Sequence, residues 1–180
     1  MNDLSLYILD LCQNAIKAKA TLLEIEIEES PSKNLLSIKI KDNGVGIKTI
    51  PNKAIDPFYT TRTTRKVGMG LSLFNEVVTL ANGRLDIKSS TKGTTLFATM
   101  EYNHIDRLEI GNIEETIIAL IFDETYDVRF VYKYEEKQFF FDTREIKKVL
   151  DGVSILDKDI LFWIRETIKR EITGIKSGGN

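Results

Sequence analysis

Alternation of apolar and charged residues is the feature that most constrains how this chain folds. Residues 23–28 alternate leucine or isoleucine with glutamate, and residues 36–41 alternate leucine or isoleucine with serine or lysine. Such a period of two is typical of a strand that is wet on one side only. A turn at residues 31–34 predicts an antiparallel hairpin whose glutamate and lysine rows face each other.

Helical spacing on either side of this hairpin indicates the fold class. Apolar residues recur at helical intervals in the first twenty residues and again from Leu71 to Ala81, where Asn82-Gly83 ends the helix. Residues 85–87 and 96–100 have the pattern of two more strands. Residues 1–102 therefore predict an α+β fold, a two-layer α/β sandwich with helices on one face of a mainly antiparallel sheet.

Residues 103–180 have their own pattern, which predicts an α+β C-terminal extension of unknown role. The spacing predicts a helix near residues 113–121, a hairpin over 127–142 and a short helix over 143–150. A final helix is expected after the capping residue Asp157, with Gly174 at its end. We therefore expect two domains, with the boundary at residue 102.

The charge balance and the cysteine count exclude several classes of protein. There are 25 lysine and arginine residues against 27 aspartate and glutamate residues, so no strong field favours nucleic acid or a membrane as partner. Cys12 is the only cysteine and cannot form an intramolecular disulfide. No apolar run reaches the roughly 18 residues of a membrane span, and a signal peptide is missing. We expect a soluble cytoplasmic protein.

The polar face of the first helix is the first candidate site. Asp10 and Asn14 lie four residues apart, so their side chains project from one face, and Lys17 falls on the same face. A carboxylate and an amide oxygen so placed can hold hydrated Mg²⁺, which prefers oxygen ligands. An ordinary solvated helix face has the same pattern, and the pair alone does not decide between the two readings.

A second candidate, Asp42-Asn43-Gly44-Val45-Gly46, comes directly after a predicted strand. Glycines two residues apart let the backbone turn sharply and let a flat ligand approach without obstruction from a Cβ atom. A carboxylate at the end of a strand is a good acceptor for an exocyclic amine. The tripeptide Asp-Asn-Gly is also an ordinary turn signal, so this alternative stays open as well.

The third candidate is the stretch from Asp56 to Leu71, inside a long region that has no period. It combines threonine hydroxyls, cations and glycines, and it runs directly into the next helix. Free N–H groups at a helix N-terminus favour phosphate binding. Neither the Walker spacing nor the Gly-x-Gly-x-x-Gly signature is present, and a polar surface loop is the alternative.

Taken in order, these segments resemble the motifs of the GHKL family, the Bergerat-fold ATPases. This family includes type II topoisomerases, heat-shock chaperones, mismatch-repair ATPases, histidine kinases and anti-sigma-factor kinases. The matching segments are Asp10-x-x-x-Asn14-Ala15 for the N box, Asp42-x-Gly44-x-Gly46 for the G1 box, Pro57-Phe58-Tyr59-Thr60-Thr61-Arg62 for the F box and lid, Gly68-Met69-Gly70-Leu71 for the G2 box and Gly93-Thr94-Thr95 on the late strand. The resemblance implies a histidine-kinase-like ATP-binding domain over residues 1–102.

The resemblance also implies how the base and the metal ion of ATP are held. Asp42 would accept a hydrogen bond from the adenine amino group, and Thr94 would add a direct or water-mediated contact. Gly44 and Gly46 would let the base seat. Asn14 would coordinate Mg²⁺ that bridges the phosphates.

The remaining part of the implied site surrounds the phosphates. The G2 box would offer backbone amides, and the lid would screen the triphosphate charge. The residues assigned in this way are Lys17, Thr61, Arg62, Arg65, Lys66, Gly68, Met69, Gly70 and Leu71. We expect the stretch between Ile47 and Gly68 to be mobile without nucleotide.

The sequence departs from the histidine kinases of this family in two ways. Only nine residues precede Asp10, so we expect no helical hairpin with a phosphoacceptor histidine, and we expect His104 to be an ordinary surface or hinge residue. Asp10 also keeps a carboxylate where histidine kinases commonly have asparagine. A carboxylate favours attack by water or a hydroxyl, because these nucleophiles gain from a general base.

Three functions remain open. The protein is a slow ATPase that drives a conformational change in a partner, a kinase for a hydroxyl or for a histidine on another chain, or a non-catalytic ATP sensor that docks a partner through residues 103–180. In the first two cases Asp10 is the catalytic residue. We expect ATP, Mg²⁺ and a partner protein to bind, whereas the oligomeric state stays open, a homodimer included.

Overall fold

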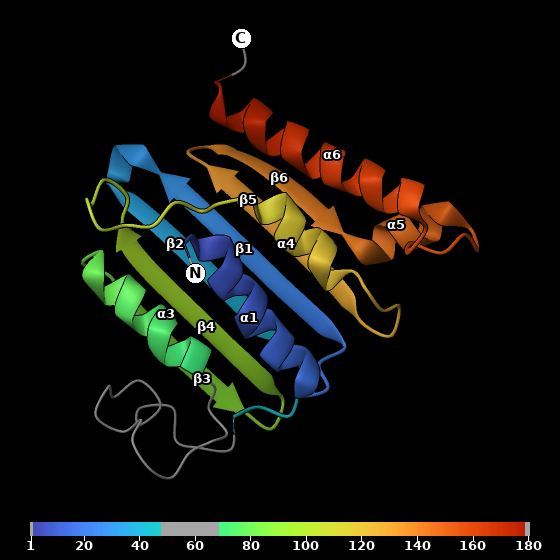
Figure 1. Cartoon of the computed structure of the whole chain (residues 1–180), viewed down its shortest axis with the longest axis horizontal. Helices are drawn as coiled ribbons and strands as arrows, with labels where there is room; N and C mark the ends of the chain where they lie inside the picture. Colours follow the sequence, from blue (N-terminus) through green and yellow to red (C-terminus); the bar gives the residue numbers. More distant parts are fainter. Residues whose placement is uncertain (1, 48–68, 179–180) are drawn as a thin grey trace.

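A computed structural model describes residues 2–47 and 69–178, which form one sheet and a layer of helices on it (Figure 1). The sheet has six strands in the order β3-β4-β2-β1-β5-β6. The elements are α1 (Leu4–Lys17), β1 (Leu22–Ser30), the 3-10 turn η1 (Pro31–Lys33), β2 (Leu35–Asp42), α3 (Met69–Leu80), β3 (Arg84–Ser90), β4 (Gly93–Glu101), α4 (Ile113–Leu120), β5 (Asp127–Tyr134), β6 (Lys137–Asp142), α5 (Thr143–Leu150) and α6 (Lys158–Lys176).

The predicted hairpin is the centre of this sheet. β1 and β2 are antiparallel, and their register places Glu24 opposite Lys41 and Glu26 opposite Lys39. The chain reverses through η1, where Asn34 takes up a left-handed conformation with φ of 51°. Asparagine tolerates this conformation because its short side chain can hydrogen-bond locally. The facing glutamate and lysine rows are confirmed.

One sheet continues across residue 102. β5 pairs with β1 in parallel, and β6 pairs with β5 in the antiparallel sense. Residues 127–142 therefore extend the sheet that residues 22–101 begin, and β1 lies between β2 and β5. The α+β class is confirmed, and the C-terminal extension adds two strands to the sheet as well as helices.

The apolar residues of the helices and strands meet on one face, the covered face of the sheet. On α1 the buried residues include Leu4, Ile8, Leu11 and Cys12, which recur at helical spacing. They pack against the buried alternate residues of the strands, such as Ile25. The helices α1, α3 and α4 lie side by side over this face, and α6 packs against α4 and the outer strands (Figure 1).

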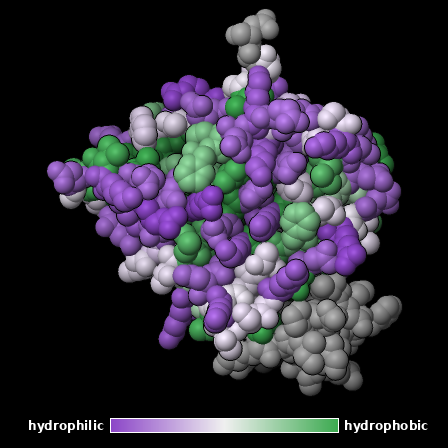
Figure 2. Space-filling model, turned by 180° about the vertical axis from the view of Figure 1, so that it is seen from behind, coloured by the Kyte–Doolittle hydropathy of each residue, from purple (hydrophilic) through white to green (hydrophobic). Residues whose placement is uncertain are grey.

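The opposite face of the sheet, the open face, has no covering helix in the described part of the chain. Seen from behind, it is mostly hydrophilic with scattered hydrophobic patches (Figure 2). Phe97 and Phe140 are the large exposed apolar side chains of the strands. Glu24 pairs with both Lys41 and Arg129 across three strands. The open face is therefore exposed to solvent, as the alternation in the sequence predicts.

The C-terminal extension also holds the start of α1. The N–H groups of Leu4 and Ser5 donate to the carbonyls of Glu109 and Ile110, and Asp3 caps the helix through Leu6 N–H. A helix leaves its first N–H groups without partners inside the helix. Residues 109–110 thus satisfy donors that would otherwise need water.

The last helix begins as the sequence predicts but ends later. Asp157 caps it by accepting from the N–H groups of Asp159 and Ile160. The expected end at Gly174 is wrong, because α6 continues to Lys176. Lys176 forms an ion pair with buried Glu29, which stabilises the final turn. Within residues 2–47 and 69–178, every helix is too short or too polar to cross a lipid bilayer.

Candidate functional site

Three polar side chains form a row on the covered face, at the end of the sheet where β2 stops. The register places Asp42 of β2 opposite Thr94 of β4, and Thr94 opposite Ser89 of β3. Thr94 is only 7% exposed. Because side chains that face one another across strands share a side of the sheet, these three groups line one wall of the site.

Asp42 keeps a carboxylate with unused acceptor capacity. Its Oδ1 atom accepts the N–H of Gly44 at 2.8 Å, and no ion pair to Asp42 is present within the described residues. Burial raises the pKa of Asp42 above its ordinary value, although backbone hydrogen bonds from Gly44 and Thr94 act in the opposite direction. The thiol of Cys12 on α1 is buried close to Asp42. Its burial and the negative charge of Asp42 both raise the pKa of this thiol.

The two glycines after Asp42 are required by close backbone contacts. A Cβ atom on Gly44 would lie 2.7 Å from the carbonyl oxygen of Ala18, and one on Gly46 would lie 2.0 Å from that of Ser90. Gly46 also has a φ of 76°, a conformation that side chains rarely adopt. The loop therefore packs tightly between the end of α1 and the end of β3.

Asn43 anchors this loop, and the sequence analysis assigned it no role. Its Oδ1 atom accepts the N–H groups of Thr21 and Leu22 at 2.8 and 2.9 Å, and its Nδ2 group donates to Thr21 Oγ1. The N–H of Val45 adds a bond to the carbonyl of Ala18. The only available signal was that asparagine side chains often bond to backbone in turns.

The N box and the G2 box meet through Asp10 and Gly70. A Cβ atom on Gly70 would lie 1.8 Å from Oδ2 of Asp10, so the carboxylate fills the space that a side chain would occupy. Gly70 is buried in the first turn of α3. The first N–H groups of a helix have no partners inside the helix, and they favour negative charge. Asp10 and the start of α3 therefore form one local structure.

The other residues proposed for the phosphate side differ in exposure. Asn14 and Lys17 are exposed on α1, so their polar ends are accessible. Met69 is exposed at the start of α3, whereas Leu71 is buried and belongs to the core. Within the described ranges, no three His, Cys, Asp or Glu side chains gather as a metal cage.

Several predicted residues lie outside the described residues. They are Thr61, Arg62, Arg65, Lys66 and Gly68, together with the whole expected lid between Ile47 and Gly68.

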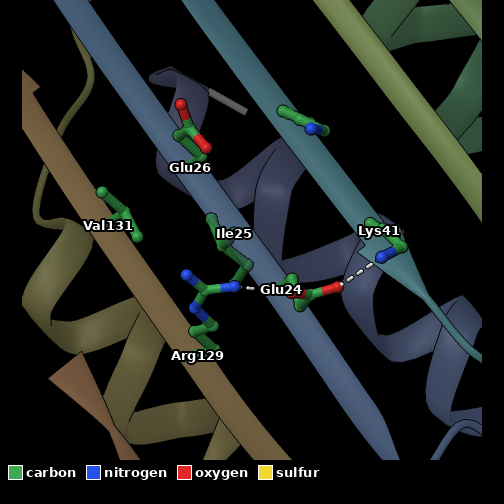
Figure 3. A pocket seen from close by; sticks show the side chains of 7 residues that line it. Glu24, Ile25, Glu26, Lys41, Arg129 and Val131 are labelled. Carbon is green, nitrogen blue, oxygen red and sulfur yellow. Dashed lines mark hydrogen bonds and ion pairs between the residues drawn. The ribbon is translucent and has the colours of Figure 1, made fainter. Parts of the chain in front are cut away.

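A hollow of about 230 Å³ lies on the open face and is separate from this site (Figure 3). Its lining residues are Glu24, Ile25, Glu26, Lys39, Lys41, Arg129 and Val131. Burial acts to raise the pKa of Glu24, but the hydrogen bonds of Lys41 and Arg129 lower it below its ordinary value. Glu24 is thus paired with the two cations beside it, and Asp42 faces the opposite side of the sheet.

Comparison with known families gives the class of this chain. Residues 2–104 match the family described as "Histidine kinase-, DNA gyrase B-, and HSP90-like ATPase". The match covers more than half of the chain, and the chain belongs to this family. The resemblance of its motifs to GHKL ATPases is confirmed, and with it an ATP-binding domain of the Bergerat fold.

Individual relatives are similar over shorter or more distant matches. The sensor protein kinase WalK of Staphylococcus aureus is 35% identical over 85 residues, which is 43% of this chain and 20% of that protein. WalK of the JH9 strain matches equally over 14% of its length, so the matches span a fifth or less of these relatives.

Solved structures also match. The N-terminal domain of a DNA repair protein is 16% identical with a TM-score of 0.48, covering 78% of this chain and 52% of that one. The Aquifex aeolicus MutL ATPase domain complexed with ADP is 15% identical with a TM-score of 0.45, covering 78% and 64%.

Proposed function

We propose that this chain binds ATP with Mg²⁺ beside Asp42 and acts on the γ-phosphate, either by slow hydrolysis or by transfer to a partner protein. The observation that carries the proposal is the packing of the Asp10 carboxylate against Gly70. This contact places a carboxylate, the candidate general base, at the start of α3, where anions are favoured. The family of the chain supports the ATP-binding part.

The described residues fit an adenine nucleotide. Gly44 and Gly46 let the loop after β2 pack closely against the backbone at Ala18 and Ser90, and Asp42 at the start of this loop supplies an acceptor for an exocyclic amine. On the phosphate side we assign the backbone of Met69 and Gly70, because N–H groups at the start of a helix bind phosphate oxygens.

Asn14 is our candidate for the Mg²⁺ ligand. Its side chain is exposed one turn after Asp10 on the same face of α1. Mg²⁺ keeps most of its waters and takes few protein ligands, so one amide oxygen is a sufficient protein contribution. The ion would supply counter-charge to the phosphates, and Lys17 adds a nearby cation.

Asp10 is our candidate for the general base. Water and hydroxyl groups lose a proton as they attack, and a positioned base contributes typically 10²–10⁴-fold to such a reaction. The carboxylate is partly accessible and is held in place by its contact with Gly70. This favours hydrolysis or hydroxyl phosphorylation, and a histidine on another chain is the remaining acceptor.

A second candidate function is ATP sensing without turnover, with a partner docked on residues 103–180. The hydrogen bonds from Leu4 and Ser5 to Glu109 and Ile110 favour it. They connect the helix that carries Asp10 and Asn14 to the C-terminal extension. A change at one end of α1 can therefore reach the extension through direct contacts.

The experiment that separates these functions follows γ-labelled ATP. The purified chain is incubated with Mg²⁺ and labelled ATP, alone and with a cell extract from which ATP has been removed. Label on free phosphate supports hydrolysis, and label on a second protein supports a kinase. ATP binding without either product leaves the sensor, and absence of ATP binding contradicts the proposal as a whole.

Matched variants of Asp10 test the chemistry. Asp10→Asn keeps the shape, so ATP binding should persist while turnover falls by about 10²-fold or more. Gly70→Ala should reproduce this loss by displacing the carboxylate, and the two changes together should be no worse than one. Asn14→Ala should instead weaken binding and turnover together. Turnover of Asp10→Asn at the wild-type rate would remove the catalytic role.

A further inference from the structure

The hydroxyl groups of Ser89 and Thr94 form a short chain of hydrogen bonds beside Asp42. The N–H of Ile47 donates to Ser89 Oγ at 2.7 Å, and Ser89 Oγ lies 2.9 Å from Thr94 Oγ1. Either hydroxyl can donate in the second contact. The direction of that one hydrogen bond decides whether Thr94 offers a donor or an acceptor to a ligand.

The hydrogen bond from Ile47 favours donation from Ser89 to Thr94. The Ser89 oxygen already accepts from Ile47, and an oxygen that accepts becomes a better donor. Within the described residues, no acceptor other than Thr94 is found for the Ser89 hydroxyl. At the other end, a Thr94 oxygen that accepts from Ser89 keeps its own hydroxyl hydrogen for a ligand beside Asp42, which lies opposite Thr94.

We infer that Ser89 is a positioning residue that fixes the buried hydroxyl of Thr94 as a hydrogen-bond donor, so that the wall of the site presents an acceptor at Asp42 beside a donor at Thr94. This inference rests on the proposed binding of a nucleotide base at Asp42. A 6-aminopurine has the complementary edge, an amine that donates and a ring nitrogen that accepts. A 6-oxopurine has the reverse edge, an oxygen that accepts and a ring N–H that donates.

Ser89 therefore selects adenine over 6-oxopurines without touching the base. If Ser89 were absent, the Thr94 hydroxyl would be free to rotate and to accept the ring N–H of a 6-oxopurine. A site discriminates between two ligands when the wrong ligand leaves a polar group without a partner. A hydroxyl that is free to rotate can pair with either ligand, so this discrimination is lost.

The test compares dissociation constants for ATP and inosine triphosphate, by calorimetry, in wild type and in Ser89→Ala. Wild type should prefer ATP, and Ser89→Ala should reduce this preference by about threefold to tenfold, the range for one hydrogen bond. Ser89→Thr, which keeps the hydroxyl, should restore it. Ser90→Ala is the matched control, since among the described residues the Ser90 hydroxyl accepts from Lys92 N–H and makes no other side-chain hydrogen bond.

A double-mutant cycle separates positioning from structural support. In a Thr94→Val background, Ser89→Ala should leave the ratio of the two affinities unchanged. If Ser89→Ala weakens both nucleotides equally in the wild-type background, Ser89 merely supports the loop and the inference is overturned. If wild type binds no ATP at all, the proposed function fails, which is a different result from an unchanged preference.

Discussion

Two carboxylates lie at opposite ends of the covered face, and their surroundings differ sharply. Glu29 of β1 is 4% exposed, and it accepts from Lys176 Nζ at 2.7 Å and from the hydroxyl of Tyr132. Asp42 is half-buried and receives only backbone N–H groups within the described residues. Glu29 lies six residues along β1 from Leu23, the partner of Asp42, so the two are about 20 Å apart.

The difference separates a structural carboxylate from one that is available to a ligand. Burying a charge is unfavourable unless it is paired and hydrogen-bonded. At Glu29 the protein supplies both a cation and a hydroxyl, and burial together with the charge of Glu29 raises the pKa of Tyr132. At Asp42 the desolvation is left partly uncompensated. A buried acid without a cation is therefore the better indicator of a site.

The largest effect should follow from breaking the Glu29 pair. Lys176→Met leaves a buried carboxylate without its cation, and we expect the free energy of unfolding to fall by about 3 kcal/mol. ATP affinity should not change. Urea denaturation and calorimetry measure the two quantities, and Lys169→Met on the exposed side of α6 is the control. Unchanged stability, or a loss of ATP affinity, would contradict the comparison.

Asp42→Asn should have the next largest effect, on binding rather than on stability. The amide cannot accept from the adenine amine as a carboxylate does, and we expect ATP affinity to fall by about 1–3 kcal/mol. The nucleotide-free protein should be at least as stable as wild type, because the burial penalty on the charge is gone. Calorimetry and thermal melting test both halves, with Asp86→Asn on β3 as the control. Equal affinities would remove Asp42 from the site.

The pH dependence of stability in wild type and in Asp42→Asn tests the same contrast, and the expected effect is smaller. Burial raises the folded pKa of Asp42 above its ordinary value of 3.8, so the folded state binds the proton more tightly than the unfolded state. The stability advantage of Asp42→Asn should be complete above the folded pKa and disappear as the pH falls to 3.8.

ATP affinity of wild type should move the other way, because only the ionised carboxylate is a full acceptor. It should fall as the pH drops through the folded pKa of Asp42. Melting curves and binding isotherms of wild type and Asp42→Asn across this range supply the measurement. A constant difference in stability between the two proteins would show that Asp42 titrates normally.

The smallest effect is expected at a third carboxylate, Glu24 on the open face. Its ion pairs with Lys41 and Arg129 are partly exposed, and such pairs contribute about 0–1 kcal/mol. Glu24→Gln should lower the unfolding free energy within that range at low salt and not at 1 M salt, where the Debye length is about 3 Å. A loss of unfolding free energy as large as that of Lys176→Met would mean that the ion pairs of Glu24 are shielded from solvent.

The local elements could be predicted from sequence because each depends on near neighbours. The β1–β2 hairpin followed from its alternation and its turn, and α6 followed from its cap at Asp157. Asp42, Gly44 and Gly46 could be placed in one loop for the same reason. The contact of Asp10 with Gly70 was not predicted, since sixty residues separate them and the family resemblance only assigned both to one site.

Contacts between distant residues could not be predicted. No pattern in β1 or β5 says that they pair in parallel, because a half-buried strand accepts either direction. Asn43 and Ser89 were missed because their roles depend on the backbone of other elements, at Thr21 and Ile47. The prediction that α6 ends at Gly174 was wrong because Lys176 forms an ion pair with Glu29, which stabilises a longer helix. Tertiary contacts decided each of these.

The parallel pairing of β1 with β5 also has a consequence for biosynthesis. Residues 22–29 of β1 pair with residues 127–134 of β5, which are synthesised about a hundred residues later. Ribosomes add about 5–20 residues per second, so one edge of β1 stays unpaired for roughly 5–20 s. Free edges recruit other strands and promote aggregation, whereas charged side chains oppose this. The glutamates 24, 26 and 28 therefore protect the nascent chain during this interval, and a chain stopped after residue 104 would depend on them permanently.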